Sequence, residues 1–325
     1  MEKADIEEIG KISIGQAQNL NAATGCTVVI CEDGAICGVD VRGGSPGTRD
    51  TDALNPINNR KCVHAVLLSG GSAFGLDAAG GVMKYLEEHR IGRDVGVTVI
   101  PNVCAAILFD LKCGDYKIRP DVKMGYEACA NAFLHQKVKS GNFGAGTGAT
   151  IGKTRGAAYA MKGGVGKSAF RHEDLFVGAI MAVNCVGDVL DNKTGKILAG
   201  ARNDDGRGFV GSESVILGEY QRKTDFFSGN TIIGCVITNA ALDKAQANKL
   251  ASLGQNGIAR AVRPAHSIYD GDTVFTMCTG EVYATLDAVG ILAAAAVEEA
   301  IIDAIRSAES LCGFPALKDI CPCTD

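Results

Sequence analysis

The length and composition of this chain indicate a globular protein with a large apolar core. It has 325 residues, of which 46% are hydrophobic and 21% are charged. This length allows one large domain or two. The formal net charge is −5 and no run of Lys or Arg stands out. Both features argue against a nucleic acid or an anionic membrane as a partner.

The sequence predicts a cytoplasmic protein without a metal or cofactor. The first eight residues are acidic and lack the apolar stretch of a signal peptide. The longest apolar tract, 290–297, is too short to cross a bilayer. Most of the 13 cysteines stand alone, as small buried residues do in cytosolic chains. The one close pair, Cys321 and Cys323, lacks both CxxC spacing and a nearby His.

The first part of the chain alternates short β-rich runs with turns and a helix. Asp33-Gly34 separates two β-rich runs, which predicts a hairpin at this point. Residues 42–52 are rich in Gly, Pro and charge, so they predict a loop that either lines a site or forms a structural turn. The remaining elements expected here are a strand at 63–68, a helix at 74–88 and a strand at 97–100.

The second part of the chain predicts a layered α/β sandwich. A helix is expected at 120–135, and a glycine-rich stretch covers 141–168. Strands are expected at 157–161, 176–184, from Thr231 to Asn239 and at 272–279, with helices at 242–262 and 283–307. Hairpins and helices mix without a regular βαβ repeat, which disfavours a doubly wound sheet or a barrel.

Two glycine-rich stretches resemble nucleotide-binding motifs only in part. Residues 144–148 match the start of a dinucleotide fingerprint, but Ala149 replaces its third glycine and no clean strand precedes it. Residues 166–168 match the end of a P-loop, but Met161 stands where the first glycine is required. These glycines fit tight turns and close backbone approach better than nucleotide binding.

The junction before Thr231 allows two interpretations. A polar, charged stretch, 201–230, runs directly into an apolar strand. The ordinary interpretation, which the local pattern favours, is a loop-to-strand boundary. The alternative is self-cleavage between Asn230 and Thr231. A freed Thr231 would carry a hydroxyl nucleophile and an α-amino group with a pKa of about 7.7–8.0, which could accept the hydroxyl proton.

Other candidate residues are ambiguous when each is taken alone. Asp270 and Asp272 flank a glycine and could bind a cation, form a turn or orient an ammonium group. Asn184 fits a strand end and Lys153 fits a solvated side chain. The five histidines show no metal-ligand spacing, and no Ser-His-Asp order is compelling.

Six blocks in the same order resemble peptidase family S58 over nearly the whole chain. The blocks are 42–52, 68–79, 144–153, 162–166, 230–234 and 270–275. The family includes L-aminopeptidase/D-amidase-esterases, β-peptidyl aminopeptidases and nylon-oligomer hydrolases. Any one block is weak, but six in order are specific.

The resemblance implies a fold, a cleavage site and a set of site residues. The expected fold is a single four-layer αββα sandwich, 1–325, similar to that of N-terminal-nucleophile hydrolases. Cleavage at Asn230–Thr231 would give an α chain, 1–230, and a β chain, 231–325, with Thr231 as nucleophile. Asn184 matches the oxyanion-hole residue, Asp270 and Asp272 match the acidic pair, and Lys153 matches a lysine near the nucleophile.

Function and assembly are also expected from the resemblance. It implies an aminopeptidase or amidohydrolase that acts on small peptides or amides through an acyl-enzyme, as a homo-oligomer, often a tetramer. The segment 103–110 lacks the tyrosine of the aminopeptidase members, which points toward the threonine branch. Two alternatives stay open: an acyltransferase of the ornithine acetyltransferase type, and an uncleaved binding protein.

Overall fold

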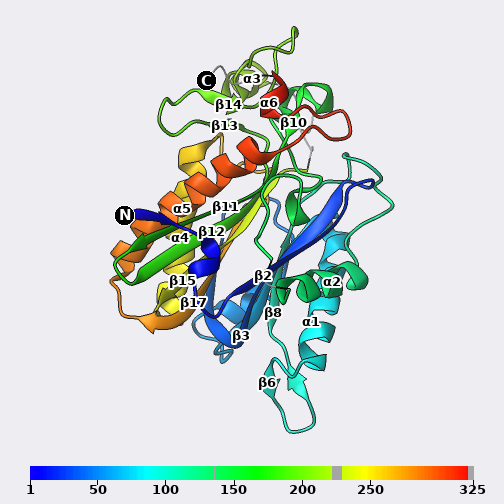
Figure 1. Cartoon of the computed structure of the whole chain (residues 1–325). Helices are drawn as coiled ribbons and strands as arrows, with labels where there is room; N and C mark the ends of the chain where they lie inside the picture. Colours follow the sequence, from blue (N-terminus) through cyan, green and yellow to red (C-terminus); the bar gives the residue numbers. More distant parts are fainter. Residues whose placement is uncertain (135, 222–228, 321–325) are drawn as a thin grey trace.

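One long strand, β3 (Thr24–Val41), is shared by the two main sheets of the fold. The computed structural model describes residues 1–134, 136–221 and 229–320 (Figure 1). The first half of β3 pairs with β2 (Ser13–Asn19) and β5 (Val63–Ser69), and its second half pairs with β17 (Thr273–Val282). The register shifts between the two halves, so each half joins a different sheet.

The order of the strands places β15 between two partners from distant parts of the chain. On one side of β3 the order is β17, β15 (Thr231–Ala240), β12 (Leu175–Asn184), β11 (Gly164–His172) and β1 (Glu2–Ala4). On the other side it is β5, β8 (Val103–Ile107) and β4 (Thr48–Arg49). β15 runs parallel to β17 and antiparallel to β12.

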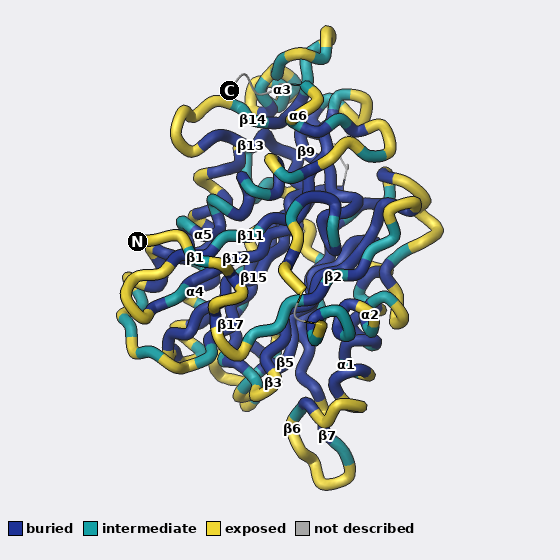
Figure 2. Tube along the Cα trace, viewed as in Figure 1, coloured by how far each residue is buried: buried dark blue, intermediate teal, exposed yellow. Residues whose placement is uncertain are grey.

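Helices cover the outer faces of both sheets, which gives four layers. α4 (Lys244–Ala261) and α5 (Leu286–Ser307) pack on one sheet, and α1 (Ala78–Glu88) and α2 (Val122–Ala132) pack on the other (Figure 1). Figure 2 shows the central strands buried and the exposed residues concentrated in the loops. The predicted αββα sandwich is therefore confirmed.

The alternation of side chains along β15 explains why the sequence forms these layers. Ile232 and Val236 belong to the apolar cluster under α4 and α5. Ile233, Cys235 and Ile237 belong to the cluster between the two sheets. A strand with both faces buried reads as a continuous apolar run, as this one does.

The remaining elements are short. The strands are β6 (Arg93–Asp94), β7 (Val99–Ile100), β9 (Thr150–Ile151), β10 (Met161–Lys162), β13 (Asp188–Leu190), β14 (Ile197–Ala199) and β16 (Val262–Arg263). The helices are α3 (Ser212–Gly218) and α6 (Leu317–Ile320). 3₁₀ turns span Ile6–Glu8, Thr51–Leu54, Ser72–Asp77, Gly144–Gly146, Lys153–Arg155 and Ala157–Tyr159. Among the residues that the structure places, no helix combines the length and apolarity needed to cross a bilayer.

The hairpin predicted at Asp33-Gly34 is wrong, because β3 continues through both residues. Gly34 has a φ of +78°, which the sequence pattern correctly associates with glycine. In the structure, Gly34 lies where the register between β3 and β5 shifts, and the chain does not reverse there. The second half of β3 has a better partner in β17, more than 200 residues away, which local sequence cannot reveal.

The strand predicted at 157–161 is also wrong. The segment forms a 3₁₀ turn, Ala157–Tyr159, followed by the short β10. The guanidinium of Arg155 lies 3.9 Å from the ring centroid of Tyr159, whose carbonyl accepts the backbone N–H of Arg202. These local contacts replace a strand ladder.

Candidate active site

Thr231 lies buried at the first position of β15, between groups from its two neighbouring strands. Asn184, the last residue of β12, is its direct partner in the antiparallel ladder. Asn230, just before it, forms a parallel bridge with Asp270 in the loop that leads to β17. Thr231 is almost fully excluded from solvent, with a relative exposure of 3%. The sheet order thus brings together residues that lie far apart in sequence.

The hydroxyl of Thr231 lies against the carbonyl of the peptide bond that precedes it. Thr231 Oγ1 donates a hydrogen bond to the oxygen of Asn230. The same oxygen accepts the backbone N–H of Gly271 at 3.1 Å. A donor aimed at this oxygen would stabilise negative charge that develops there during attack on the carbonyl carbon.

Gly271 can approach this closely only because it has no side chain. A Cβ at this position would lie 2.9 Å from Thr231 Oγ1 and 2.7 Å from the carbonyl oxygen of Ser45. The backbone of Ser45 in turn donates to the carbonyl of Asp270 at 2.8 Å. The glycine-rich loop whose role the sequence left open therefore clamps the turn that carries the acidic pair.

Asn184 is fully buried and its side chain contacts four protein groups. Its Oδ1 accepts hydrogen bonds from the backbone N–H of Thr150 at 2.9 Å and from Lys153 Nζ at 3.0 Å. Its Nδ2 donates to the carbonyl oxygens of Phe109 at 3.0 Å and Gly229 at 3.3 Å. In the intact chain this amide therefore faces the carbonyl of Gly229, one residue before the carbonyl that Thr231 contacts.

Lys153 is a buried lysine that binds the peptide segment before Thr231. Its Nζ donates to the backbone oxygen of Asn184 at 2.9 Å and to that of Gly229 at 3.1 Å. Burial is the main cause that lowers the pKa of Lys153 to about 7, since the charged form loses its hydration. Its sequence context alone predicts a solvated lysine, and that prediction is wrong.

The two carboxylates of the acidic pair hold different parts of the site. Asp270 accepts hydrogen bonds from the backbone N–H of Ser267 at 3.1 Å and its hydroxyl at 2.5 Å. Asp272 Oδ1 accepts the N–H of Ile232 at 2.7 Å, and its Oδ2 accepts the N–H and Nδ1 of His266. Burial, and then the nearby charge of Asp272, raise the pKa of Asp270 to about 6.

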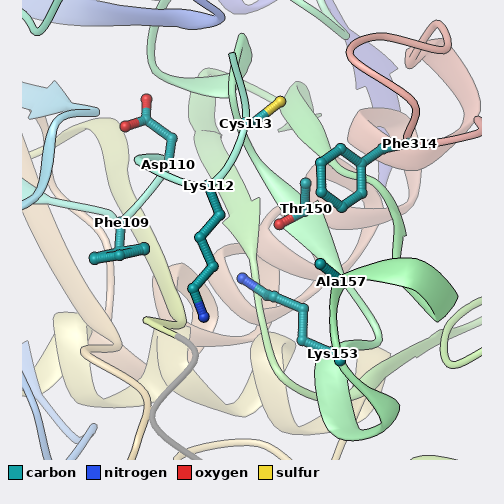
Figure 3. A pocket seen from close by; sticks show the side chains of 9 residues that line it. Phe109, Asp110, Lys112, Cys113, Thr150, Lys153, Ala157 and Phe314 are labelled. Atoms are coloured by element: carbon teal, nitrogen blue, oxygen red, sulfur yellow. The ribbon is translucent and has the colours of Figure 1, made fainter. Parts of the chain in front are cut away.

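A small pocket opens beside Lys153, whose Nζ also contacts the backbone oxygen of Gly229. Together with the open solvent at its mouth, it encloses about 370 Å³. Its lining includes Phe109, Lys112, Lys153 and Phe314, and the two lysine side chains extend toward each other in Figure 3.

The described residues include no cluster of three or more His, Cys, Asp or Glu with metal-binding geometry. The Cys321/Cys323 pair considered above lies outside the described residues, as do residues 222–228 of the polar stretch before Thr231. Sequence inspection missed the backbone N–H groups of Gly271 and Thr150 and the side chain of His266. Backbone donors leave no residue-type signal, but His266 is the histidine nearest to the acidic pair in sequence.

Comparison with solved structures identifies the fold class. The L-aminopeptidase D-Ala-esterase/amidase of Ochrobactrum anthropi aligns with a TM-score of 0.68 and 17% identity, over 96% of this chain and 88% of that one. A β-aminopeptidase of Burkholderia sp. aligns with a TM-score of 0.67 and 19% identity, over 98% and 93%. The first is described as a variant of the Ntn hydrolase fold, so this chain has that fold.

Sequence comparison then shows the family: the model of Peptidase family S58 matches residues 4–317, and the chain belongs to this family. An uncharacterized aminopeptidase of Mycobacterium leprae is 39% identical over 95% of this chain and 92% of its own length. The 6-aminohexanoate-oligomer endohydrolase of Paenarthrobacter ureafaciens is 29% identical over 83% and 74%. The chain is a hydrolase that acts on peptide or amide bonds.

Proposed function

We propose that this chain cleaves itself between Asn230 and Thr231 and then works as an N-terminal-nucleophile aminopeptidase or amidohydrolase. The observation that carries the proposal is the contact between the Thr231 hydroxyl and the Asn230 carbonyl, whose oxygen also accepts the Gly271 N–H. Cleavage would give an α chain, 1–230, and a β chain, 231–325.

Self-cleavage would proceed through an ester. Thr231 Oγ1 attacks the carbonyl carbon of Asn230 and loses its proton, and the Gly271 N–H stabilises the oxyanion. The C–N bond then breaks, and the nitrogen of Thr231 takes up a proton and becomes an amine. Water hydrolyses the ester that now joins Asn230 to Thr231 Oγ1, which leaves a carboxylate on Asn230 and a free hydroxyl on Thr231.

The mature site would use the new N-terminus as its base. The α-amino group of Thr231, with a reference pKa of about 7.7–8.0, accepts the hydroxyl proton as Oγ1 attacks a substrate amide. The amine product leaves, and water hydrolyses the acyl-enzyme. In this cycle the carboxamide of Asn184 donates to the oxyanion, because departure of Gly229 releases its Nδ2.

The remaining site residues would orient and tune the nucleophile. Asp270 and Asp272 lie next to the backbone of Asn230 and Ile232, where they can balance the charge of the new ammonium group. Lys153 and Asp270 have pKa values shifted toward neutrality from opposite directions, a pattern typical of acid–base pairs in active sites.

Substrate, assembly and location are part of the same proposal. The size of the pocket beside Lys153 supports small peptides or amides as substrates. The free thiols of the described cysteines, most of them buried, support a reducing, cytoplasmic location. A homo-oligomer, often a tetramer, follows from the family resemblance alone.

The test is the intact mass of the wild type and of Thr231 variants under denaturing conditions. Wild type and Thr231→Ser should give two fragments that meet at Asn230/Thr231, whereas the near-isosteric Thr231→Val should stay intact. Thr238→Val, in the same buried strand, is the matched control and should cleave normally. Amide hydrolysis should follow cleavage, and a wild type that stays intact yet hydrolyses amides would refute the proposal.

A further inference from the structure

We propose that His266 is a positioning residue that holds Asp272 in the orientation that the nucleophile requires. This inference rests on the proposed function of Thr231. His266 acts on the nucleophile through the carboxylate of Asp272 and not through a contact of its own. Its role would be in the self-cleavage and in the hydrolysis that follows.

Both hydrogen-bond donors of His266 converge on one oxygen. The backbone N–H lies 3.1 Å from Asp272 Oδ2, and the ring Nδ1 lies 2.9 Å from the same atom. Asp272 is 1% exposed, so water cannot replace these donors. A buried carboxylate that loses a donor becomes less stable in its charged form and is free to turn.

The backbone of His266 adopts an unusual conformation that makes this convergence possible. Its φ is +57°, in the left-handed region that non-glycine residues occupy in only a few per cent of cases. Such conformations persist where the surrounding structure requires them, and they cluster at functional sites. Here the conformation turns the ring back toward the carboxylate six residues later in the chain.

Among the residues that the structure describes, Asp272 is the hydrogen-bond partner of the ring. Nε2 is buried and has no hydrogen-bond partner within the described part of the chain. The contact with Asp272 places the ring proton on Nδ1, since a carboxylate accepts and does not donate when ionised. The hydrogen bonding of the imidazole is therefore committed to Asp272.

The opposite oxygen of Asp272 connects this contact to the chemistry. Oδ1 accepts the N–H of Ile232 at 2.7 Å, which fixes the peptide that joins Thr231 to the rest of β15. If Asp272 turned, this peptide and the hydroxyl beside it would shift. Misplacement of a reacting group by about 1 Å can cost on the order of 100-fold in rate.

Three substitutions separate hydrogen bonding from shape. His266→Asn keeps a donor close to the position of Nδ1, and asparagine tolerates a positive φ. His266→Gly removes the ring and also tolerates this backbone. His266→Leu matches the shape of asparagine without its donor. His89→Ala is the control, because it removes a ring that hydrogen-bonds to the carbonyl of Tyr85 at the end of α1.

The primary measurement is the rate of fragment formation by full-length chains made by cell-free translation, followed by denaturing mass spectrometry. The kcat and KM of matured variants on an aminoacyl p-nitroanilide that the wild type hydrolyses are measured next. His266→Gly and His266→Leu should slow self-cleavage and kcat by about 10–100-fold, the range by which loss of an outer-shell hydrogen bond lowers activity in metal sites. KM should stay within about threefold, and His266→Asn should restore most of both rates.

Two outcomes would overturn the inference. One is that the glycine and leucine variants process and hydrolyse like the wild type. The other is that all three variants melt like the wild type but the His266→Asn variant cleaves itself and hydrolyses amides as slowly as the His266→Leu variant. That result would mean that only the shape of the ring matters. If the His266→Gly variant fails to fold, the comparison between asparagine and leucine decides. If Thr231→Val still cleaves, the proposed function itself fails. No result from the His266 variants alone would show this, so the two failures can be told apart.

Discussion

At the scale of single residues, the lowered pKa of Lys153 predicts how stability depends on pH. The folded-state pKa of about 7 lies below the reference value of about 10.4 for an unfolded lysine. Between these values the unfolded chain binds more protons, so the free energy of unfolding rises as pH increases through this window. The Lys153→Met variant has no titrating group at this position, so it lacks this rise in the free energy of unfolding.

The comparison is made in uncleaved Thr231→Val chains, with and without Lys153→Met, by urea unfolding at about pH 6.5 and about pH 9, on either side of the folded-state pKa. The chain that retains Lys153 should gain stability relative to the methionine variant at the higher pH. Lys162, whose burial lowers its pKa to about 8, contributes equally to both chains and cancels. An identical pH dependence in the two chains would contradict the assignment.

Gly229 gives a second prediction at this scale. Its φ is +64°, and a Cβ there would lie 2.2 Å from the ring of Phe109. Gly229→Ala should therefore displace the peptide that Lys153 and Asn184 hold and slow self-cleavage by at least about tenfold. Gly211→Ala has a similar positive φ, but a Cβ there would approach no atom closer than 3.7 Å. It separates backbone strain from the clash and should cleave normally.

The sequence assigned roles to Asn184, Lys153, Asp270 and Asp272 only through the family resemblance, whereas the polar-to-apolar junction before Thr231 already raised self-cleavage as an alternative. Each of them taken alone also fitted an ordinary structural position: a loop-to-strand boundary for Thr231, a strand end for Asn184, a solvated side chain for Lys153 and a turn for the two aspartates. Lys153 shows why: its burial depends on Asn184 and Gly229, which lie 31 and 76 residues away. Local polarity cannot report a partner at that separation.

At the scale of elements, close packing between β11 and α5 gives a stability prediction. A Cβ on Gly166 would lie 2.0 Å from the backbone oxygen of Ala300 and 2.3 Å from the backbone nitrogen of Ala304. Backbone atoms cannot yield as a side chain does, so Gly166→Ala should push the helix off the strand. We expect a loss of about 1–3 kcal/mol in the free energy of unfolding.

Urea unfolding of uncleaved chains checks this value, with Gly218→Ala as the control. Gly218 ends α3 and a Cβ there would meet nothing within 4 Å. The control should be neutral or slightly stabilising, because alanine restricts the unfolded chain more than glycine does. Equal effects at both positions would argue against packing as the cause.

Elements with a strong local pattern were predictable and elements with distant partners were not. The apolar run of β15 and the alanine-rich α5 follow from composition, because each is buried on most of its surface. The continuity of β3 does not, since its second half is decided by pairing with β17. The same glycine that suggested a hairpin accommodates a register shift.

At the scale of the whole molecule, the sheet order predicts what would follow the proposed cleavage. The strands of one sheet would be divided between the two products: β15 and β17 would belong to the β chain, and their partners β12 and β3 to the α chain. β15 pairs with β12 from Thr231 to Thr238, and β17 pairs with β3 from Thr273 to Cys278. Both ladders would therefore cross the boundary between the two proposed chains.

The apolar clusters cross the same boundary. The cluster under α4 and α5 includes Met181 and Val183, which would belong to the α chain, together with Val236, Val274 and Val297, which would belong to the β chain. Separation of the products would expose this surface to water, at a cost of roughly 25 cal/mol for each Å² of apolar area. The two chains should therefore stay associated and unfold together.

This last prediction is tested by comparing native and denaturing mass spectrometry of the matured protein. Denaturing conditions should give the two chains, whereas native conditions should give the 33.7 kDa pair or a multiple of it. Thermal melting should show one transition that both chains share, because the sheet beside α4 and α5 contains strands of both chains. A free β chain at native conditions, or two separate transitions, would mean that the shared sheet does not hold the products together.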